Sequence, residues 1–318
     1  MDIELSAIVP LIPDLPFSDV EGTRRDMAEM MAGYQPDLAD VLLDEHDIAG
    51  PDDRRLTLRI FRPTAPETNR PMVLDIHGGG FAMGSASLDD TTNIALARDL
   101  GCLVVSVEYR LAPEHPFPAG ADDCYAALTW IAEHGVEWGG DMNRIALVGE
   151  SAGACLAATT ALFARDRGGP VVSMLAMLEP EIDDRMTTHS MINGADTVAW
   201  NNKQGKLSWE YYLGEHLGNP PRHAAPARTA DLSGLPPTYV TVNELDCLRD
   251  EGLEFASRLM QSGVSTELHC WAGTYHGFRV LGPDTGVART ANALLMTAVR
   301  RGLAIDTTTH ETFQEVVA

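Results

Sequence analysis

Short runs of apolar residues alternate with longer stretches of mixed polarity along most of the chain. The runs with the length and β-branched content of strands are Leu56–Phe61, Met72–Ile76, Leu103–Val107, Ile145–Val148, Val171–Leu178 and Thr238–Val242. Stretches of helical length lie between several of them, at Asp89–Leu100, Ala119–His134, Ala152–Arg167 and Asp250–Ser262. Strands that alternate with helices predict an α/β fold, with a mostly parallel sheet covered by helices on both faces.

The first fifty residues depart from this alternation. They are predicted to be helical after Pro16, with Asp19 or Thr23 as the cap. Three methionines follow at helical spacing, Met27, Met30 and Met31. Simple packing is the preferred interpretation of these methionines, and a flexible lid over an apolar pocket is the alternative.

A second departure lies between two of the expected strands. Residues 183–218 are polar and aromatic, and their large aromatic residues are Trp200, Trp209, Tyr211 and Tyr212. An insertion at this place is where a cap over the sheet edge is expected.

The charge of the chain excludes several classes of partner. It has 318 residues and a formal net charge of −23. Because phosphates would be repelled, nucleic acid and anionic membrane surfaces are not expected partners. No run approaches the roughly 18 apolar residues that cross a bilayer, and the N-terminus lacks the basic flank of a secretory signal. A cytoplasmic protein is therefore expected.

The cysteines give no sign of a metal site. There are five, Cys102, Cys124, Cys155, Cys247 and Cys270, without a CxxC pair or a Cys/His ligand spacing. We expect reduced and mostly buried thiols, and no bound metal.

The strongest local signal is the sequence GESAG at 149–153. It directly follows the apolar run Ile145–Val148 and opens a helix of small residues. A serine on a sharp strand-to-helix turn needs small neighbours, and such a turn projects the Ser151 hydroxyl above the sheet. The alternative is a glycine-rich turn whose serine only caps the helix.

A second signal is HGGG at 77–80, at the end of the run Met72–Ile76. Consecutive glycines let backbone N–H groups face a ligand, as acyl transfer requires where the carbonyl oxygen becomes an oxyanion. A phosphate-binding loop is the competing interpretation, but the GK[ST] and GxGxxG patterns are absent. His77 is expected to hold this loop by hydrogen bonding and not to act as a base.

A serine nucleophile also needs a base and an orienting carboxylate. His276 follows the strand-like run Ser265–Trp271, in a position where a sheet presents catalytic groups. His269 lies within that run and His310 lies near the C-terminus, so both are poorer candidates. Asp246 follows the run Thr238–Val242 and is the preferred acid, with Glu244 as the alternative.

Together these segments resemble the hormone-sensitive-lipase-like family of serine esterases, known as bacterial family IV. The resemblance rests on HGGG at 77–80, YRLAPE at 109–114, FPA at 117–119, GESAG at 149–153, DCLRDE at 246–251 and HGF at 276–278. It covers most of the chain, and the order Ser151, Asp246, His276 is the order of α/β hydrolases.

The resemblance implies an α/β-hydrolase fold with about eight strands and a helical cap. The cap would comprise residues 1–45 and 183–218, and the hydrolase core residues 46–182 and 219–318. Ser151 would be the nucleophile, His276 the base and Asp246 its partner. The N–H groups of Gly79, Gly80 and Ala152 would form the oxyanion hole.

Some positions depart from the usual family pattern. Ala154 stands where a glycine often follows, and Cys247 where a proline is common. Glu179 occupies a place usually held by an uncharged residue, and its carboxylate near the pocket would disfavour anionic acyl groups. A pairing of Glu179 with an arginine such as Arg185 is the preferred explanation.

The resemblance implies a serine carboxylesterase that acts on short- to medium-chain acyl esters through an acyl-enzyme intermediate. Neither a metal nor an organic cofactor is needed. The apolar pocket residues expected are Phe81, Met83, Trp200, Trp209 and Phe278, each with core packing as the alternative. A lactone, amide or carbamate hydrolase with the same triad remains open, and a silent receptor or an interfacial lipase is disfavoured. The expected partner is a small ester, and a homodimer is compatible with the sequence.

Overall fold

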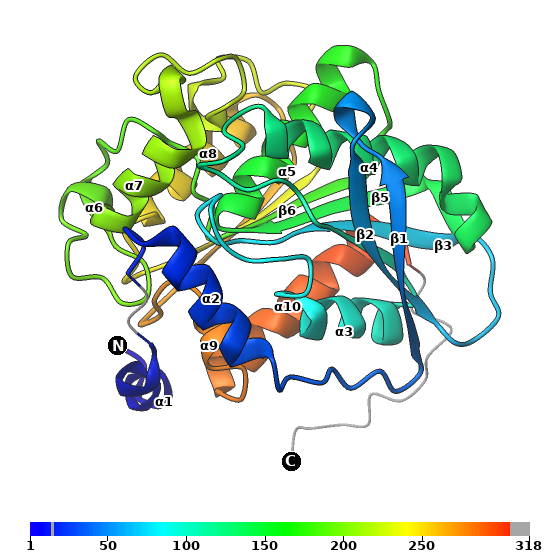
Figure 1. Cartoon of the computed structure of the whole chain (residues 1–318), viewed down its shortest axis with the longest axis horizontal. Coiled ribbons are helices and arrows are strands. Elements are labelled where there is room, and N and C mark those ends of the chain that lie inside the picture. The colour runs from blue at the N-terminus through cyan, green and yellow to red at the C-terminus, as the bar shows by residue number, and fades with distance from the viewer. Residues whose placement is uncertain (14–15, 306–318) are drawn as a thin grey trace.

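The centre of the computed structural model, which describes residues 1–13 and 16–305, is an eight-stranded sheet (Figure 1). The strand order is β1-β2-β4-β3-β5-β6-β7-β8. Their bounds are β1 Val41–Ala49, β2 Arg55–Pro63, β3 Arg70–Ile76, β4 Leu103–Val107, β5 Gly140–Glu150, β6 Met174–Leu178, β7 Thr238–Asn243 and β8 Thr266–Trp271. Only β2 pairs antiparallel with its neighbours β1 and β4; the other pairs are parallel. The predicted α/β fold with a mostly parallel sheet is confirmed.

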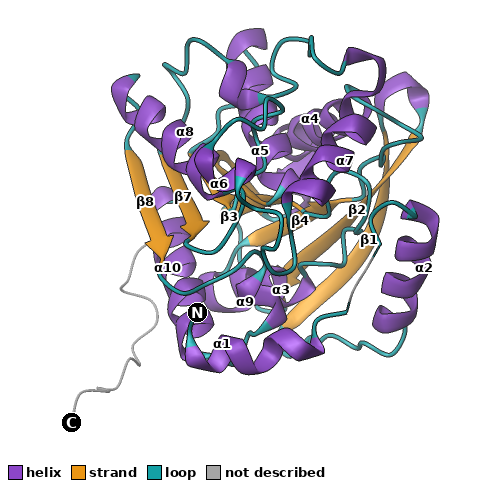
Figure 2. Ribbon diagram, turned by 90° about the vertical axis from the view of Figure 1, so that its left-hand side faces the viewer, coloured by secondary structure: helices purple, strands orange, loops and turns teal. Residues whose placement is uncertain are grey.

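Helices cover both faces of this sheet (Figures 1 and 2). Their bounds are α1 Ile3–Ile8, α2 Val20–Met31, α3 Asp90–Leu100, α4 Ala119–His134, α5 Ala152–Arg167, α6 His189–Ile192, α7 Asn202–Leu213, α8 Arg249–Gln261, α9 Phe278–Leu281 and α10 Gly286–Gly302. One core lies between the sheet and α4, α5 and α8, and the other lies against α3 and α10. Leu74 of β3 packs in the first core and its neighbour Val73 in the second, because successive strand residues face opposite ways.

The continuous apolar runs predicted the central strands well, whereas an edge strand escaped prediction. β1 has only its two near-terminal residues Val41 and Ile48 buried, so it lacks an apolar run. It begins inside the range 1–45 that the sequence assigned to the cap. The run Val171–Leu178 enters the sheet only at Met174, since Val171 is exposed.

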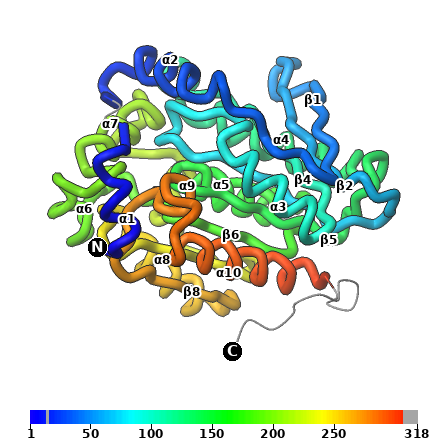
Figure 3. Tube along the Cα trace, turned by 90° about the horizontal axis from the view of Figure 1, so that it is seen from below, coloured from blue at the N-terminus to red at the C-terminus, as the bar shows by residue number. Residues whose placement is uncertain are grey.

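The two segments that interrupt the alternation pack against each other. Asp19 caps α2, and its Oδ1 accepts a hydrogen bond from Gly22 N at 2.9 Å; the alternative cap, Thr23, is buried. Phe17, just before α2, contacts two aromatic rings of the insertion. Its ring centroid lies 5.1 Å from that of Trp200 and 5.7 Å from that of Tyr211. The N-terminal segment and α7 therefore lie side by side, as Figure 3 shows from below.

Within the described residues, no helix combines the length and the apolar character needed to cross a membrane. His310, one of the histidines considered as a base, lies outside the described residues.

Candidate active site

Ser151 occupies a sharp turn between β5 and α5. β5 ends at Glu150 and α5 begins at Ala152, and Ser151 between them has φ 56° and ψ −121°. This backbone conformation costs a non-glycine residue about 1–3 kcal/mol, so the surrounding structure must hold the turn in place. The turn also needs a small residue behind it, because a Cβ on Gly153 would lie 2.0 Å from the Ile76 carbonyl oxygen.

His276 joins Ser151 to Asp246 through its two ring nitrogens. Its Nε2 lies 3.0 Å from Ser151 Oγ, and its Nδ1 lies 2.7 Å from Asp246 Oδ2. All three residues are buried. With the proton on Nδ1, the neutral imidazole donates to Asp246 and accepts from the Ser151 hydroxyl. The structure thus brings together three side chains that are 95 and 30 positions apart in sequence order.

His269 and Glu244, the alternatives for the base and the acid, make other contacts. The Nε2 atom of His269 lies 2.7 Å from Glu267 Oε1, on the edge strand β8. Glu244 Oε2 accepts a hydrogen bond at 2.6 Å from the backbone N–H of Gly273. Neither of the two residues contacts His276, so Asp246 is the expected acid that the fold places beside the imidazole, and Glu179 is a second carboxylate there.

The glycine loop after β3 lies against the serine turn. A Cβ on Gly78 would be 3.4 Å from Ser151 Cβ. Gly79 has φ +113° and Gly80 φ +57°, conformations that side chains rarely adopt, so the loop requires glycine there. Within the described part of the chain, the N–H groups of Gly79, Gly80 and Ala152 donate to no turn or loop hydrogen bond.

His77 stabilises this loop, as the sequence predicts. Its Nδ1 lies 2.8 Å from the Gly78 carbonyl oxygen, and its ring stacks on Tyr109 with centroids 4.2 Å apart. The Tyr109 hydroxyl donates to the His77 carbonyl oxygen at 2.9 Å. Burial lowers the pKa of His77 to about 4, so it is neutral at pH 7.

Negative charge surrounds the buried imidazole of His276. Burial by itself would lower the pKa of His276, but the charge of Asp246 and its hydrogen bond outweigh burial and raise the pKa to about 10. Glu179 and Glu150 add to this rise. The environment therefore favours the imidazolium that forms when the ring accepts a proton.

The comparisons with known proteins agree with this arrangement. A family model described as the alpha/beta hydrolase fold matches residues 73–280. The esterase LipI of Mycobacterium tuberculosis is 40% identical over 262 residues, which cover 81% of this chain and 81% of that protein. The chain belongs to this α/β-hydrolase family.

Other members are also esterases. The arylesterase of Saccharolobus solfataricus is 34% identical over 71% of this chain and 74% of that protein. Among solved structures, the bacterial heroin esterase is 43% identical, covers 95% of this chain and 98% of that chain, and superposes with a TM-score of 0.92. The expected hormone-sensitive-lipase-like family is confirmed, and the chain is a carboxylic ester hydrolase.

An apolar cavity of about 520 Å³ lies on the far side of Trp200 from His276 and is lined by none of Ser151, Asp246 and His276. Trp200 lines it, and the Trp200 ring centroid is 6.0 Å from that of His276. Met83 lines it as well, as predicted. The N-terminal segment and α9 contribute further wall residues, among them Met27, Met30, Met31 and Leu281. Simple packing is therefore an incomplete account of the methionines of α2, since all three face this cavity.

Three of the aromatic residues expected at the pocket pack elsewhere in the hydrolase. Phe81 stacks on Tyr212 with centroids 3.9 Å apart, and Trp209 lies 5.4 Å from Phe81. Phe278 is fully buried in a cluster with Leu5 of α1. None of these three lines the 520 Å³ cavity. Large aromatic side chains beside a loop bury their apolar surface by packing against one another. The local sequence does not distinguish such packing from contact with a ligand.

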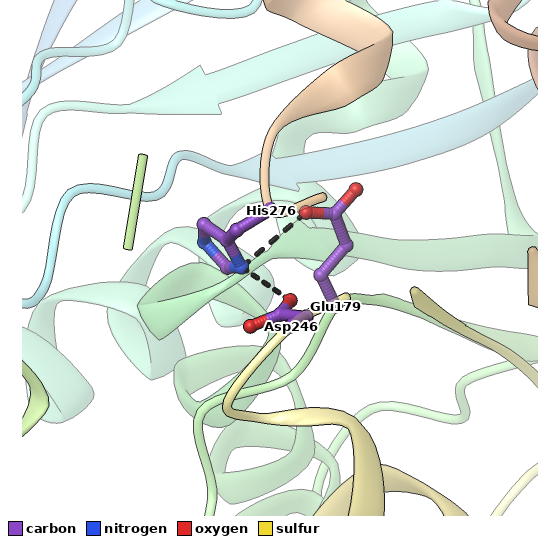
Figure 4. Close-up of side chains that lie close together, drawn as sticks. All are labelled: Glu179, Asp246 and His276. Carbon is purple, nitrogen blue, oxygen red and sulfur yellow. Dashed lines mark hydrogen bonds and ion pairs between the residues drawn. The ribbon is translucent and has the colours of Figure 1, made fainter. Parts of the chain in front are cut away.

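Glu179 does not pair with Arg185, so that expectation is wrong. Arg185 pairs instead with Asp183, at 2.7 Å between Nε and Oδ1. Glu179 Oε2 accepts the backbone N–H of Gly277 and lies 3.4 Å from His276 Nδ1 (Figure 4). Glu179 therefore lies beside the imidazole and not on the cavity wall.

Proposed function

We propose that Ser151, His276 and Asp246 form the catalytic triad of a carboxylesterase that acts through an acyl-enzyme intermediate. The observation that carries the proposal is the continuous pair of contacts from Ser151 Oγ to His276 Nε2, 3.0 Å, and from His276 Nδ1 to Asp246 Oδ2, 2.7 Å. His276 removes the Ser151 proton as Oγ attacks the ester carbonyl, and the protonated ring then delivers that proton to the departing alcohol. Water then attacks the acyl-enzyme with His276 as the base, and the ring returns the proton to Ser151 Oγ as the acid product leaves.

The N–H groups of Gly79, Gly80 and Ala152 stabilise the oxyanion in this proposal. Gly79 and Gly80 follow Gly78, whose backbone lies against the serine turn, and Ala152 is the first residue of α5, where the helix dipole is positive. Loss of one such donor typically costs about 100- to 1,000-fold in turnover.

The substrates we propose are short- to medium-chain acyl esters. The cavity of about 520 Å³ beside Trp200 is of a size that holds a small ligand, and it is mostly apolar. We propose that a two-part cap covers this cavity and that it consists of the segment before β1 and residues 183–218. Since β1 begins at Val41, the first part of the cap ends near residue 40.

Lactones, amides and carbamates pass through the same tetrahedral chemistry, so a specialised hydrolase of one of these is the competing proposal. A panel of p-nitrophenyl esters with acyl chains of different lengths, assayed beside lactones and anilides, separates the two. The highest kcat/KM for butyrate or hexanoate esters supports the carboxylesterase. A clear preference for a lactone or an amide contradicts it.

The role of Ser151 is tested with Ser151→Ala and a fluorophosphonate probe. We expect the variant to lose nearly all activity on p-nitrophenyl butyrate and all covalent labelling. Ser173→Ala is the control, because Ser173 Oγ only donates to the Asn143 carbonyl oxygen at 3.2 Å, away from the triad. A native chain that the probe does not label would instead indicate a receptor-like protein.

A homodimer and a cytoplasmic location complete the proposal. The five cysteines are free thiols and four are buried, which fits a reducing compartment. Sedimentation of the purified chain tests the dimer, and fractionation of the source cells tests the location.

A further inference from the structure

Two carboxylates meet at one nitrogen of His276. Asp246 Oδ2 lies 2.7 Å from Nδ1, and Glu179 Oε2 lies 3.4 Å from the same atom (Figure 4). A serine triad requires one carboxylate, so the second has no place in the proposed mechanism. In the described part of the chain these three residues are also the one group close enough to hold a metal ion. However, Nδ1 here carries the proton it donates to Asp246, whereas a metal ligand must offer a lone pair.

The sheet topology brings the two acids together. Glu179 follows directly after β6, and Asp246 follows β7 by three residues. β6 and β7 are parallel neighbours, and β7 pairs in the same way with β8, after which His276 lies. Because the carboxyl ends of parallel strands share one edge of the sheet, Glu179 is placed beside the triad by the same geometry as Asp246.

Burial and a strained backbone make the position of Glu179 energetically unfavourable. Its contacts with Gly277 and His276 are the interactions that offset this cost. The side chain is fully buried, with an exposed fraction of 0%. Its backbone has φ 51°, a region that non-glycine residues rarely adopt. Oε2 accepts the N–H of Gly277, the residue after His276, and Oε1 has no partner among the described residues. No arginine or lysine in that part of the chain neutralises it, so the imidazole is its one cationic neighbour when protonated.

Besides Glu179, the carboxyl groups that interact with the charge of the ring are those of Asp246, Glu150 and Glu181. Asp246 makes the 2.7 Å hydrogen bond, and Glu150 at the end of β5 pairs with Arg279 Nη2 of α9 at 3.1 Å. Burial raises the pKa of Glu179 to about 7, and the His276 charge opposes this rise, so Glu179 is a carboxylate in the alkaline range where the ring loses its proton. The carboxylate form of Glu179 is therefore linked to the protonated form of the ring.

We propose that Glu179 is a positioning residue for His276, a second carboxylate that holds the turn at His276 and Gly277 and shares the imidazolium charge with Asp246. This inference rests on the proposed role of His276 as the base. The proton moves from Ser151 Oγ to His276 Nε2 and then to the leaving alcohol. Nδ1 keeps its proton throughout, and Glu179 gains none.

The first test is Glu179→Gln, which keeps the size of the side chain and removes the charge. We expect kcat to fall about tenfold, with KM unchanged within about twofold, since one charge-assisted contact to the imidazolium is lost. The acidic limb of the pH profile of kcat/KM shifts to lower pH, because a missing negative charge makes the imidazolium easier to deprotonate. A role of Glu179 in packing alone would leave the pH midpoint in place.

The matched control is Glu181→Gln. Glu181 is equally buried and only two residues away, and burial raises its pKa to about 8, so it is neutral at pH 7. It makes no hydrogen bond to His276 and acts on the ring only through its charge at longer range, so its replacement should shift the acidic limb less than Glu179→Gln does. A Glu179→Gln variant that folds normally and has the wild-type pH midpoint overturns the inference.

A second test uses Asp246→Asn with and without Glu179→Gln. Where a triad has a single acid, its replacement by asparagine costs about 10,000-fold in kcat. We expect Asp246→Asn alone to lose less than about 1,000-fold, because Glu179 takes up the Nδ1 proton contact, and the double variant to show the full loss. Equal activities of the single and the double variant contradict the inference. An active Ser151→Ala variant would contradict the proposed function. The Glu179 and Asp246 variants test only the positioning role of Glu179.

Discussion

A single methyl group at Gly153 should separate the serine turn from the glycine loop. Gly153 is the second residue of α5 and is buried. An ideal Cβ at this position lies 2.0 Å from the Ile76 carbonyl oxygen and 2.5 Å from that of His77. Ordinary Cβ contacts begin at 3.4 Å, so the end of β3 and the start of α5 must move apart by more than an ångström. Both obstacles are backbone atoms, which cannot rotate away as a side chain would.

Two effects oppose each other in Gly153→Ala. Alanine is favoured over glycine in a helix by about 1 kcal/mol. Overpacking against a rigid neighbour costs about 1–3 kcal/mol, and here it lies at the upper end because the neighbour is backbone. We expect a net loss of about 1–2 kcal/mol in the free energy of unfolding. The N–H groups of Gly79 and Gly80 also move away from Ser151, so kcat falls by about 100- to 1,000-fold.

Urea unfolding followed by circular dichroism gives the stability, and hydrolysis of p-nitrophenyl butyrate gives kcat and KM. Gly33→Ala is the matched control, because a Cβ there meets nothing within 4 Å. That variant should keep the wild-type activity. If Gly153→Ala also retained wild-type kcat and stability, the close contact between the serine turn and β3 would be refuted as a constraint on the site.

Two further predictions concern the base and the cap. Because the surrounding carboxylates raise the pKa of His276, the imidazolium persists to higher pH than a free imidazole, and only the neutral ring accepts the Ser151 proton. Activity should therefore rise from pH 7 to pH 9, and an acidic limb with its midpoint below 6.5 would contradict the electrostatic argument. Asp19→Ala removes the cap of α2, which should destabilise that helix by about 1 kcal/mol and raise KM a few-fold with kcat unchanged, since Met27 and Met30 line the cavity. A fall in kcat with an unaltered KM would show that α2 acts on the chemistry and not on binding.

Part of the site could be predicted because its signals are local or ordered along the chain. The GESAG turn and the HGGG loop each depend on neighbouring residues, and both lie where an apolar run meets polar sequence. His276 and Asp246 were placed by their positions after strands. The pocket could not be predicted in this way, since Phe81 and Trp209 are as apolar as Trp200 and only packing separates them.

The sequence by itself determined the alternation of central strands and helices, the serine turn and the chain order of the proposed triad. It could do so because a buried strand must be continuously apolar, and a strained turn must be flanked by small residues. The tertiary structure decided which residues face the cavity and which acid lies beside the imidazole. Glu179 shows the reason: its partner Gly277 is 98 residues away, and only the parallel pairing of β6, β7 and β8 brings the two together. Local sequence pairs Glu179 with Arg185, whereas the sheet pairs it with the turn that carries His276.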